Sequence, residues 1–386
     1  MVNLIRSSEE CIYIKYLFLD KHERVIEYPT LFINSRLNNA RYSPQTVYQY
    51  SKVLKYFCCY LERNQPNISV DDSLRAIEGN FIDTYIKKMS YSGLKAATIR
   101  NRDAIIKEFM VWLTSEESGK ARENSGYIES KLKSAKPSRC LPKYVVTEEV
   151  IRFLSYLHDE NQRCLVHFLY DTGVRISEVP RMKLSDLPDL SKHPLEANYF
   201  KLHIEGSKGR GGQIKPRDTY VTRTMIERIH RLHQNNKVYL KALVRYKKDM
   251  PLFLNVFGEL LTNKAISDLI YKAKIRSEMN IHAHRFRHGF AMSILASEMD
   301  NSLINKLVMI KEALGHEDIQ TTQIYSSIAP QVIQKIRQEN IDNLIPCRFE
   351  EAQRIYEETF KPQKNHKEKR GRSKRVSSAK NSSTNS

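Results

Sequence analysis

Four short segments between residues 172 and 325 carry basic, imidazole and phenol side chains. Arginine guanidinium groups bind phosphate oxygens in a fork geometry and stay charged at any working pH. A tyrosine hydroxyl becomes a nucleophile once its proton is accepted or its phenolate is stabilised, and lysine or histidine can transfer protons. The segments are Thr172–Glu178, Gly206–Gly209, His284–His288, and Leu314–His316 followed nine positions later by Tyr325.

The order and spacing of these segments resemble the catalytic domain of tyrosine recombinases, also called phage integrases. The most specific elements are His284 and Arg287, three positions apart, and His316 followed by Tyr325. The resemblance covers roughly residues 145–345. Taken singly, each of these residues has an ordinary structural interpretation as an exposed arginine, a structural histidine or a core tyrosine. Their joint occurrence in this order favours an active site.

The resemblance implies a transesterification in which the Tyr325 hydroxyl attacks a DNA phosphate and forms a 3′-phosphotyrosyl bond. Arg175 and Arg287 would bind the non-bridging oxygens, where negative charge develops. The phosphotyrosine conserves the energy of the broken phosphodiester, so resealing needs no ATP. With two arginines and a lysine at the phosphate, no metal is required.

The remaining roles also follow from the resemblance. His284 would be the base or proton relay, and His316 would add a hydrogen bond to the phosphate. Glu178 would orient or polarise His284.

Lys208 would be the general acid that protonates the leaving 5′-oxygen. Arg210 and Lys215 compete for this role, because all three lie on the same turn between two expected strands. Lys208 is preferred because it follows Gly206 near the start of the turn.

Composition supports a polyanionic partner. The 386 residues include 63 Lys and Arg against 44 Asp and Glu, a formal charge of +19, which favours nucleic acid over the alternative of a membrane surface. The chain has no apolar run long enough to span a bilayer and no signal-peptide pattern. The six cysteines form no CxxC pair and no zinc spacing, which favours thiols in a reducing cytoplasm. P-loop, dinucleotide and HExxH motifs are absent, so we expect no cofactor and no metal.

The elements that must position these residues are mostly helical. Apolar residues recur at helical spacing from Ser43-Pro44 onward, over about 81–89 and from about 97, and a helix is expected to open at Thr147. Alternation over 199–204 and 219–221 predicts a hairpin. The fold class is therefore mostly α with a small β-sheet: a helical, SAM-like core-binding domain followed by a mixed α/β catalytic domain.

We expect six regions along the chain. They are an N-terminal extension with a hairpin (1–27), a helical core-binding DNA domain (28–130), a basic linker (131–143), the catalytic domain (144–345), a C-terminal helix (346–360) and a disordered basic tail (361–386). The residues expected to contact DNA are Lys87, Lys88, Lys95, Arg100, Arg210 and Lys215.

The C-terminal helix carries an apolar stripe suited to contact a neighbouring protomer, although packing on its own domain is the alternative. The expected partners are double-stranded DNA, three further copies of the chain on two recombination sites, and accessory proteins that bend DNA or set direction, with no membrane. The expected location is the cytoplasm, at the nucleoid, for a protein encoded by a bacterium, phage or mobile element. Two other functions stay open: a type IB topoisomerase and a catalytically silent DNA-binding regulator.

Overall fold

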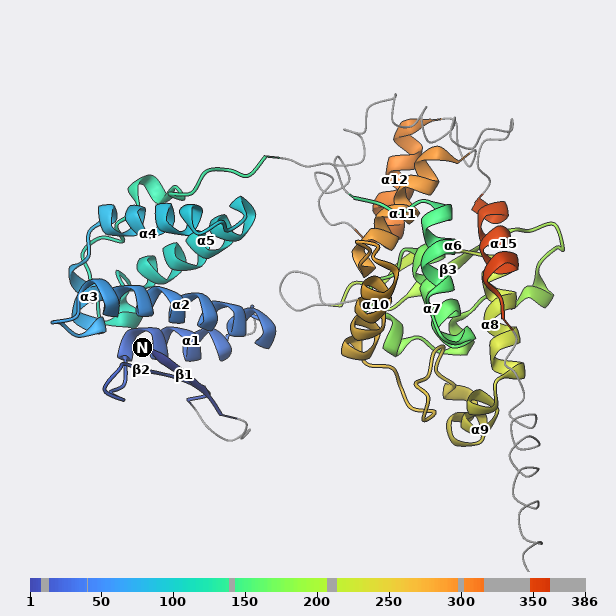
Figure 1. The fold of residues 1–386 in the computed structure, drawn as a ribbon, viewed down its shortest axis with the longest axis horizontal. Helices are drawn as coiled ribbons and strands as arrows, with labels where there is room; N and C mark the ends of the chain where they lie inside the picture. The colour runs from blue at the N-terminus through green and yellow to red at the C-terminus, as the bar shows by residue number, and fades with distance from the viewer. Residues whose placement is uncertain are drawn as a thin grey trace, which may run out of the picture. The chain divides into compact units, whose positions relative to one another are not determined.

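The computed structural model describes residues 1–7, 14–39, 41–138, 143–206, 214–297, 302–315 and 348–361. These residues form two compact units that separate near residue 140 (Figure 1). Each unit has its own hydrophobic core. No helix among the described residues is both long and apolar enough to cross a bilayer.

The first unit is a helical bundle with one small hairpin. Its strands pair antiparallel, with Asn3 opposite Leu19 and Arg6 opposite Tyr16, and Leu19 also bridges to Val25. The hairpin expected within residues 1–27 is therefore formed by Asn3–Arg6 and Tyr16–Leu19. The elements are β1 (Asn3–Arg6), β2 (Tyr16–Leu19), α1 (Glu27–Leu37), α2 (Pro44–Asn64), α3 (Val70–Ala76), α4 (Gly79–Tyr91) and α5 (Ala96–Trp112).

Helix α2 shows why the sequence pattern was informative here. The Ser43 hydroxyl accepts a hydrogen bond from the Thr46 N–H at 3.1 Å, which caps the helix, and Pro44 occupies the first turn. Val47 and Phe57, from the expected apolar face, are fully buried. The helices expected over 81–89 and from 97 are confirmed as α4 and α5. The short helix α3 and helix α1 were not expected.

Part of the expected linker packs on the first unit. Asp103 is fully buried and accepts hydrogen bonds from the backbone N–H and the hydroxyl of Ser134, both at 2.7 Å. Lys133 forms an ion pair with Asp83 at 3.1 Å. A buried carboxylate needs such partners, so the part of the linker around Lys133 and Ser134 is held against the bundle.

The second unit surrounds a two-stranded sheet with helices. Strands β3 and β4 pair antiparallel, with Tyr199 opposite Thr222 and Ile204 opposite Arg217, which confirms the expected hairpin. Helix α6 begins at Thr147, as expected. The elements are α6 (Thr147–Ser155), α7 (Glu160–Thr172), β3 (Tyr199–Ile204), β4 (Arg217–Thr222), α8 (Arg223–Asn235), α9 (Lys237–Tyr246), α10 (Asn263–Ser277), α11 (Ala283–Ala296), α12 (Leu303–Leu314) and α15 (Arg348–Thr359).

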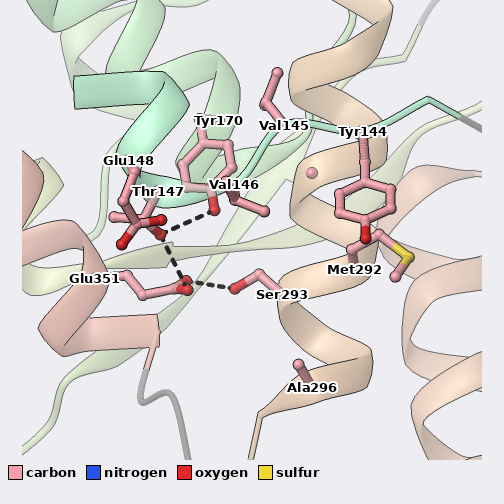
Figure 2. A pocket seen from close by; sticks show the side chains of 11 residues that line it. Tyr144, Val145, Val146, Thr147, Glu148, Tyr170, Met292, Ser293, Ala296 and Glu351 are labelled. Atoms are coloured by element: carbon pink, nitrogen blue, oxygen red, sulfur yellow. Dashed lines mark hydrogen bonds between the residues drawn. The ribbon is translucent and has the colours of Figure 1, made fainter. Parts of the chain in front are cut away.

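Helix α15 docks on its own unit, against α6, α7 and α8. Ile355 is fully buried in the main core. Glu351 accepts hydrogen bonds from the hydroxyls of Ser293 on α11 at 2.6 Å and Thr147 on α6 at 3.1 Å, beside a small cavity of about 60 Å³ (Figure 2). The alternative of local packing is therefore the one observed. Of the expected apolar stripe, Ala352 and Ile355 are buried in their own unit, whereas Phe349, Tyr356 and Phe360 stay partly exposed.

Candidate active site

The first site segment follows the end of α7. Gly173 closes the helix in the left-handed conformation, with φ of 63°. A Cβ at Gly173 would lie 2.6 Å from the Phe290 ring, so neither the backbone angle nor the space tolerates a side chain. This explains the Thr-Gly pair. The chain turns sharply after Gly173 and carries Arg175 out of the core, where its side chain is 34% exposed.

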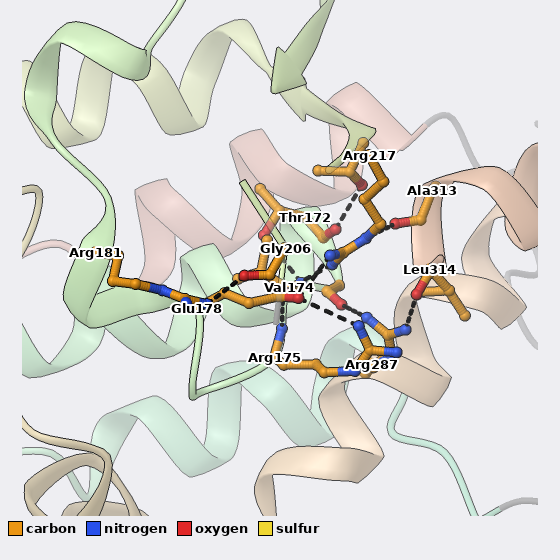
Figure 3. A network of polar contacts seen from close by, with 12 residues as sticks. Thr172, Val174, Arg175, Glu178, Arg181, Gly206, Arg217, Arg287, Ala313 and Leu314 are labelled. Atoms are coloured by element: carbon orange, nitrogen blue, oxygen red, sulfur yellow. Dashed lines mark hydrogen bonds and ion pairs between the residues drawn. The ribbon is translucent and has the colours of Figure 1, made fainter. Parts of the chain in front are cut away.

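Glu178 lies beneath Arg175 and is almost fully buried. Its carboxylate accepts hydrogen bonds from the Arg175 backbone N–H at 2.8 Å and from Arg175 Nη1 at 3.2 Å. Arg217, at the start of β4, donates to both Glu178 oxygens at 2.6 and 2.8 Å (Figure 3). Burial alone would raise the pKa of Glu178, but the hydrogen bonds and charge of Arg217, and then those of Arg175, lower it to about 2.

These contacts correct the expected role of Glu178. Its two oxygens are occupied by the two arginines, and no hydrogen bond to His284 occurs among the described residues. A carboxylate buried at this depth is stabilised best by cations that can donate in pairs. Glu178 therefore orients Arg175 and not His284.

The second site segment is the first turn and a half of α11. Arg287 is buried and donates to the Gly173 carbonyl at 2.6 Å and to the Leu314 carbonyl. Gly173 and Leu314 lie at the C-terminal ends of α7 and α12, where backbone carbonyls have no partner within the helix. One guanidinium thus holds two helix ends together at the site.

His284 lies one turn before Arg287. Burial lowers the pKa of His284 below its usual value, and the charges of Arg287 and His282 lower it further. The next histidine on the same face, His288, has its ring 5.1 Å from that of His284 and a pKa lowered to about 4, by burial first. At neutral pH, His284 is therefore uncharged and able to accept a proton.

Three of the expected catalytic residues open into one groove of about 690 Å³. Arg175, His284 and Arg287 line it together with residues of α10, among them Tyr271 and Lys274. An anion in this groove would meet two guanidinium groups and a neutral imidazole. No group of histidine, cysteine and acidic residues suited to hold a metal ion was found in the part of the chain that the structure describes.

The other residues expected at the site are either outside the described residues or exposed near the hairpin. Lys208, Arg210, His316 and Tyr325 lie outside the described residues. Lys215 is exposed just before β4. Gly315, directly before His316, ends α12 with φ of 59°.

The residues expected to contact DNA in the first unit differ in exposure. Lys87, Lys88 and Lys95 are exposed, and Lys88 lies 5.1 Å from the centre of the Tyr60 ring. Arg100 is only partly exposed and donates to the Ser134 carbonyl at 3.0 Å. Arg100 therefore has a structural role in holding the 131–138 segment.

Sequence reasoning missed Arg217 as a site residue. Its only signal was the strand register, which places Arg217 opposite Ile204 at the end of the hairpin where the connecting turn begins and ends. Arg181 was also missed and donates to the Gly206 carbonyl at the other side of that end.

Comparison with known proteins shows which family the second unit resembles. Residues 143–331 match the model of the phage integrase family. The chain is 25% identical over 312 residues to tyrosine recombinase XerC of Bacillus pumilus, covering 79% of this chain and 93% of that protein. It is 24% identical over 271 residues to tyrosine recombinase XerD of Bifidobacterium longum, covering 67% and 80%.

Solved structures share the fold. The recombinase XerH, in a post-cleavage complex with its difH substrate, aligns with a TM-score of 0.56 at 19% identity and covers 83% of this chain and 91% of that one. The Tn1549 transposon integrase, in complex with circular intermediate DNA, aligns with a TM-score of 0.55 at 16% identity and covers 80% and 98%.

Proposed function

We propose that the chain is a tyrosine-type DNA recombinase of the phage integrase family, which exchanges strands between specific DNA sites through a 3′-phosphotyrosyl intermediate on Tyr325. The observation that carries the proposal is the groove that Arg175, His284 and Arg287 line within the matched domain. These residues come from two chain segments more than a hundred positions apart, which only the fold brings together.

Arg175 and Arg287 bind the non-bridging oxygens of the scissile phosphate. Arg175 contributes an exposed guanidinium held from beneath by Glu178. Arg287 contributes charge from the buried side of the groove. Fixed donors of this kind stabilise a transition state without reorganising, because the fold has already oriented them.

Proton transfer completes the reaction. The lowered pKa of His284 leaves its imidazole neutral, so it can accept the proton of the Tyr325 hydroxyl or relay it. Lys208 protonates the leaving 5′-oxygen, and His316 adds a hydrogen bond to the phosphate. The bond energy is kept in the phosphotyrosine, so the free 5′-hydroxyl of a second strand can reseal the DNA.

The DNA partner is supported by a formal charge of +19 and by the DNA-bound recombinases that share the fold. Exchange between two duplexes requires four cleavages, which we assign to four protomers. The Tn1549 integrase is a transposon protein, which supports integration or excision of a mobile element as the biological task. The curated relatives are bacterial, which supports action on DNA in the cytoplasm.

Covalent capture from random sequences tests this proposal and identifies the target at the same time. Full-length protein is incubated with a library of random duplexes that carry a nick, so that a cleaved end diffuses away and traps the adduct. Adducts that survive denaturation are then recovered and sequenced. Enrichment of one sequence with inverted repeats is the expected result.

Tyr325→Phe should abolish this capture and leave binding to the recovered duplex intact, because only the nucleophilic oxygen is lost. Tyr271→Phe is the matched comparison, since Tyr271 is an exposed tyrosine of the same groove. It should still form the adduct. Adduct formation by the Tyr325 variant, or its loss in the Tyr271 variant, would reassign the nucleophile.

A further inference from the structure

All three guanidinium nitrogens of Arg217 donate to acceptors within the protein. Nη1 and Nη2 donate to the two oxygens of Glu178, and Nε donates to the Ala313 carbonyl at 2.8 Å. The side chain is only 6% exposed. Because each nitrogen already has a protein acceptor, Arg217 is arranged to act on other residues of the site and not on a phosphate.

The first effect of Arg217 is electrostatic. Glu178 is the carboxylate that orients Arg175, through the backbone N–H and Nη1. A carboxylate with Arg175 as its only partner would cancel the charge that Arg175 offers to an anion. With Arg217 present, the cluster of one carboxylate and two guanidinium groups keeps one net positive charge.

The second effect is geometric. Arg217 reaches from β4 to the last turn of α12, where Ala313 precedes Leu314 and Gly315. A Cβ at Gly315 would lie 2.6 Å from Arg217 Cδ, so the arginine packs directly against this helix end. Figure 3 shows Arg217 between Ala313 on one side and Glu178 on the other. Arg217 thus connects the segment that carries Arg175 to the residue directly before His316.

We propose that Arg217 is a positioning residue of the recombination site, which neutralises Glu178 so that Glu178 can orient Arg175 without cancelling its charge. The proposal rests on the proposed function, because it gives Arg175 the phosphate as its ligand. It makes a specific claim about charge: removing Arg217 slows cleavage because the negative charge of Glu178 is then not compensated.

The experiment is a double-mutant cycle on the full-length chain, with the duplex recovered by covalent capture as substrate. Three quantities are measured for each protein: the single-turnover cleavage rate, the affinity for the duplex, and the melting temperature. The variants are Arg217→Ala, Arg217→Lys, Glu178→Gln and the double variant Arg217→Ala with Glu178→Gln. Arg223→Ala is the matched control, because Arg223 follows the other end of β4 and donates only to the carbonyls of Ala197 and Pro194.

Arg217→Ala should slow cleavage about tenfold to a hundredfold, the range usual for partners that orient a catalytic ligand, with little change in affinity. Arg217→Lys should be slowed less, because it keeps the charge and loses the paired donation. Glu178→Gln should slow cleavage when introduced into the wild-type chain. It should accelerate cleavage when introduced into the Arg217→Ala chain, which gives the double variant. This reversal of sign is the signature of charge compensation, which a purely structural role would not produce at matched melting temperatures. Arg223→Ala should cleave at the wild-type rate.

Two results would overturn the proposal. One is wild-type cleavage by Arg217→Ala, and the other is a double variant no faster than Arg217→Ala alone. If Arg217→Ala does not fold, the double variant and Arg217→Lys decide, because neither leaves Glu178 uncompensated. Two rate ratios are then compared: Glu178→Gln over the double variant, and the wild-type chain over Arg217→Lys. A first ratio equal to or larger than the second contradicts the proposal. A wild-type chain that forms no adduct at all would instead refute the proposed function.

Discussion

Arg175 and Arg287 differ in how deeply each side chain is buried and in which protein groups it already contacts. Arg175 is a third exposed and is held from one side by Glu178. Arg287 is buried and joins the carbonyls of Gly173 and Leu314. The two arginines should therefore respond differently to the same substitution, although the proposed reaction needs both.

Arg175→Lys should reduce single-turnover cleavage by about a hundredfold to a thousandfold, because lysine keeps the charge and loses the fork. Its melting temperature should barely change. Arg287→Lys should lower both cleavage and the melting temperature, because two helix-end carbonyls lose their donor. Near-normal cleavage by either variant would remove that arginine from the phosphate clamp. An unchanged melting temperature for Arg287→Lys would contradict its second role.

Glu178 also predicts a dependence of stability on pH. Its pKa is lowered from 4.5 to about 2, so its ionised form is stabilised in the folded state. That contribution is complete above the unfolded value of 4.5 and is lost as the pH falls toward 2. Calorimetry of wild-type and Glu178→Gln chains should show a difference in melting temperature that shrinks over this interval. Groups common to both proteins cancel in the difference, so a gap that stays constant with pH would exclude ionised Glu178 as the source.

At the scale of elements, the helix ends matter as much as the helix faces. α7 and α12 both end in a left-handed glycine, and both ends are fastened by arginines from other elements. This arrangement lets the chain leave each helix abruptly, and the turn after α7 presents Arg175. Local sequence near Gly173 and Gly315 encodes the turns, whereas the arginines that fasten them come from β4 and α11.

Periodicity and turn chemistry explain which parts of the fold could be predicted from the sequence. The apolar face of α2, its start near Ser43-Pro44 and the alternation of β3 are local signals, and each was predicted. The Arg217–Glu178 pair joins residues 39 positions apart and has no local signal, so it was missed. The contact between Arg100 and Ser134 had no local signal either, because Ser134 lies in a segment that looked like a free linker.

The burial of Ile355 predicts how a substitution in helix α15 changes stability. Ile355→Ala should lower the stability of the second unit by about 2–5 kcal/mol, the usual cost of emptying a fully buried aliphatic site. Gln353→Ala is the matched control, because Gln353 lies on the exposed face of the same helix. Denaturant unfolding of the DNA-free chain measures both. If α15 were instead held by a neighbouring protomer, Ile355→Ala would leave the dilute protein unchanged and would weaken only its assembly on DNA.

At the scale of the whole molecule, positive charge is spread over both units and the C-terminal tail. Exposed lysines such as Lys87 and Lys95 lie on the first unit, while the 361–386 segment, of which residues 362–386 lie outside the described range, contains nine basic residues and one acidic residue. Contacts between such side chains and phosphates add affinity and carry no sequence information. Base recognition must then come from the folded units.

Deleting residues 362–386 should therefore weaken binding to every duplex by a similar factor and leave the cleaved sequence unchanged. The cut is placed after Lys361 because its backbone N–H still donates to Glu160 at 3.3 Å, close to the end of α15. The slope of log affinity against log salt should become shallower by about 0.9 for each phosphate that the tail no longer neutralises. A full-length control with the basic tail residues replaced by glutamine should match the deletion, since length without charge releases no counterions. Fluorescence anisotropy over a salt series, paired with covalent capture from the random library, measures both quantities. Recovery of a different sequence by the truncated chain would mean that the tail reads bases, and an unchanged salt slope would mean that it does not touch the backbone.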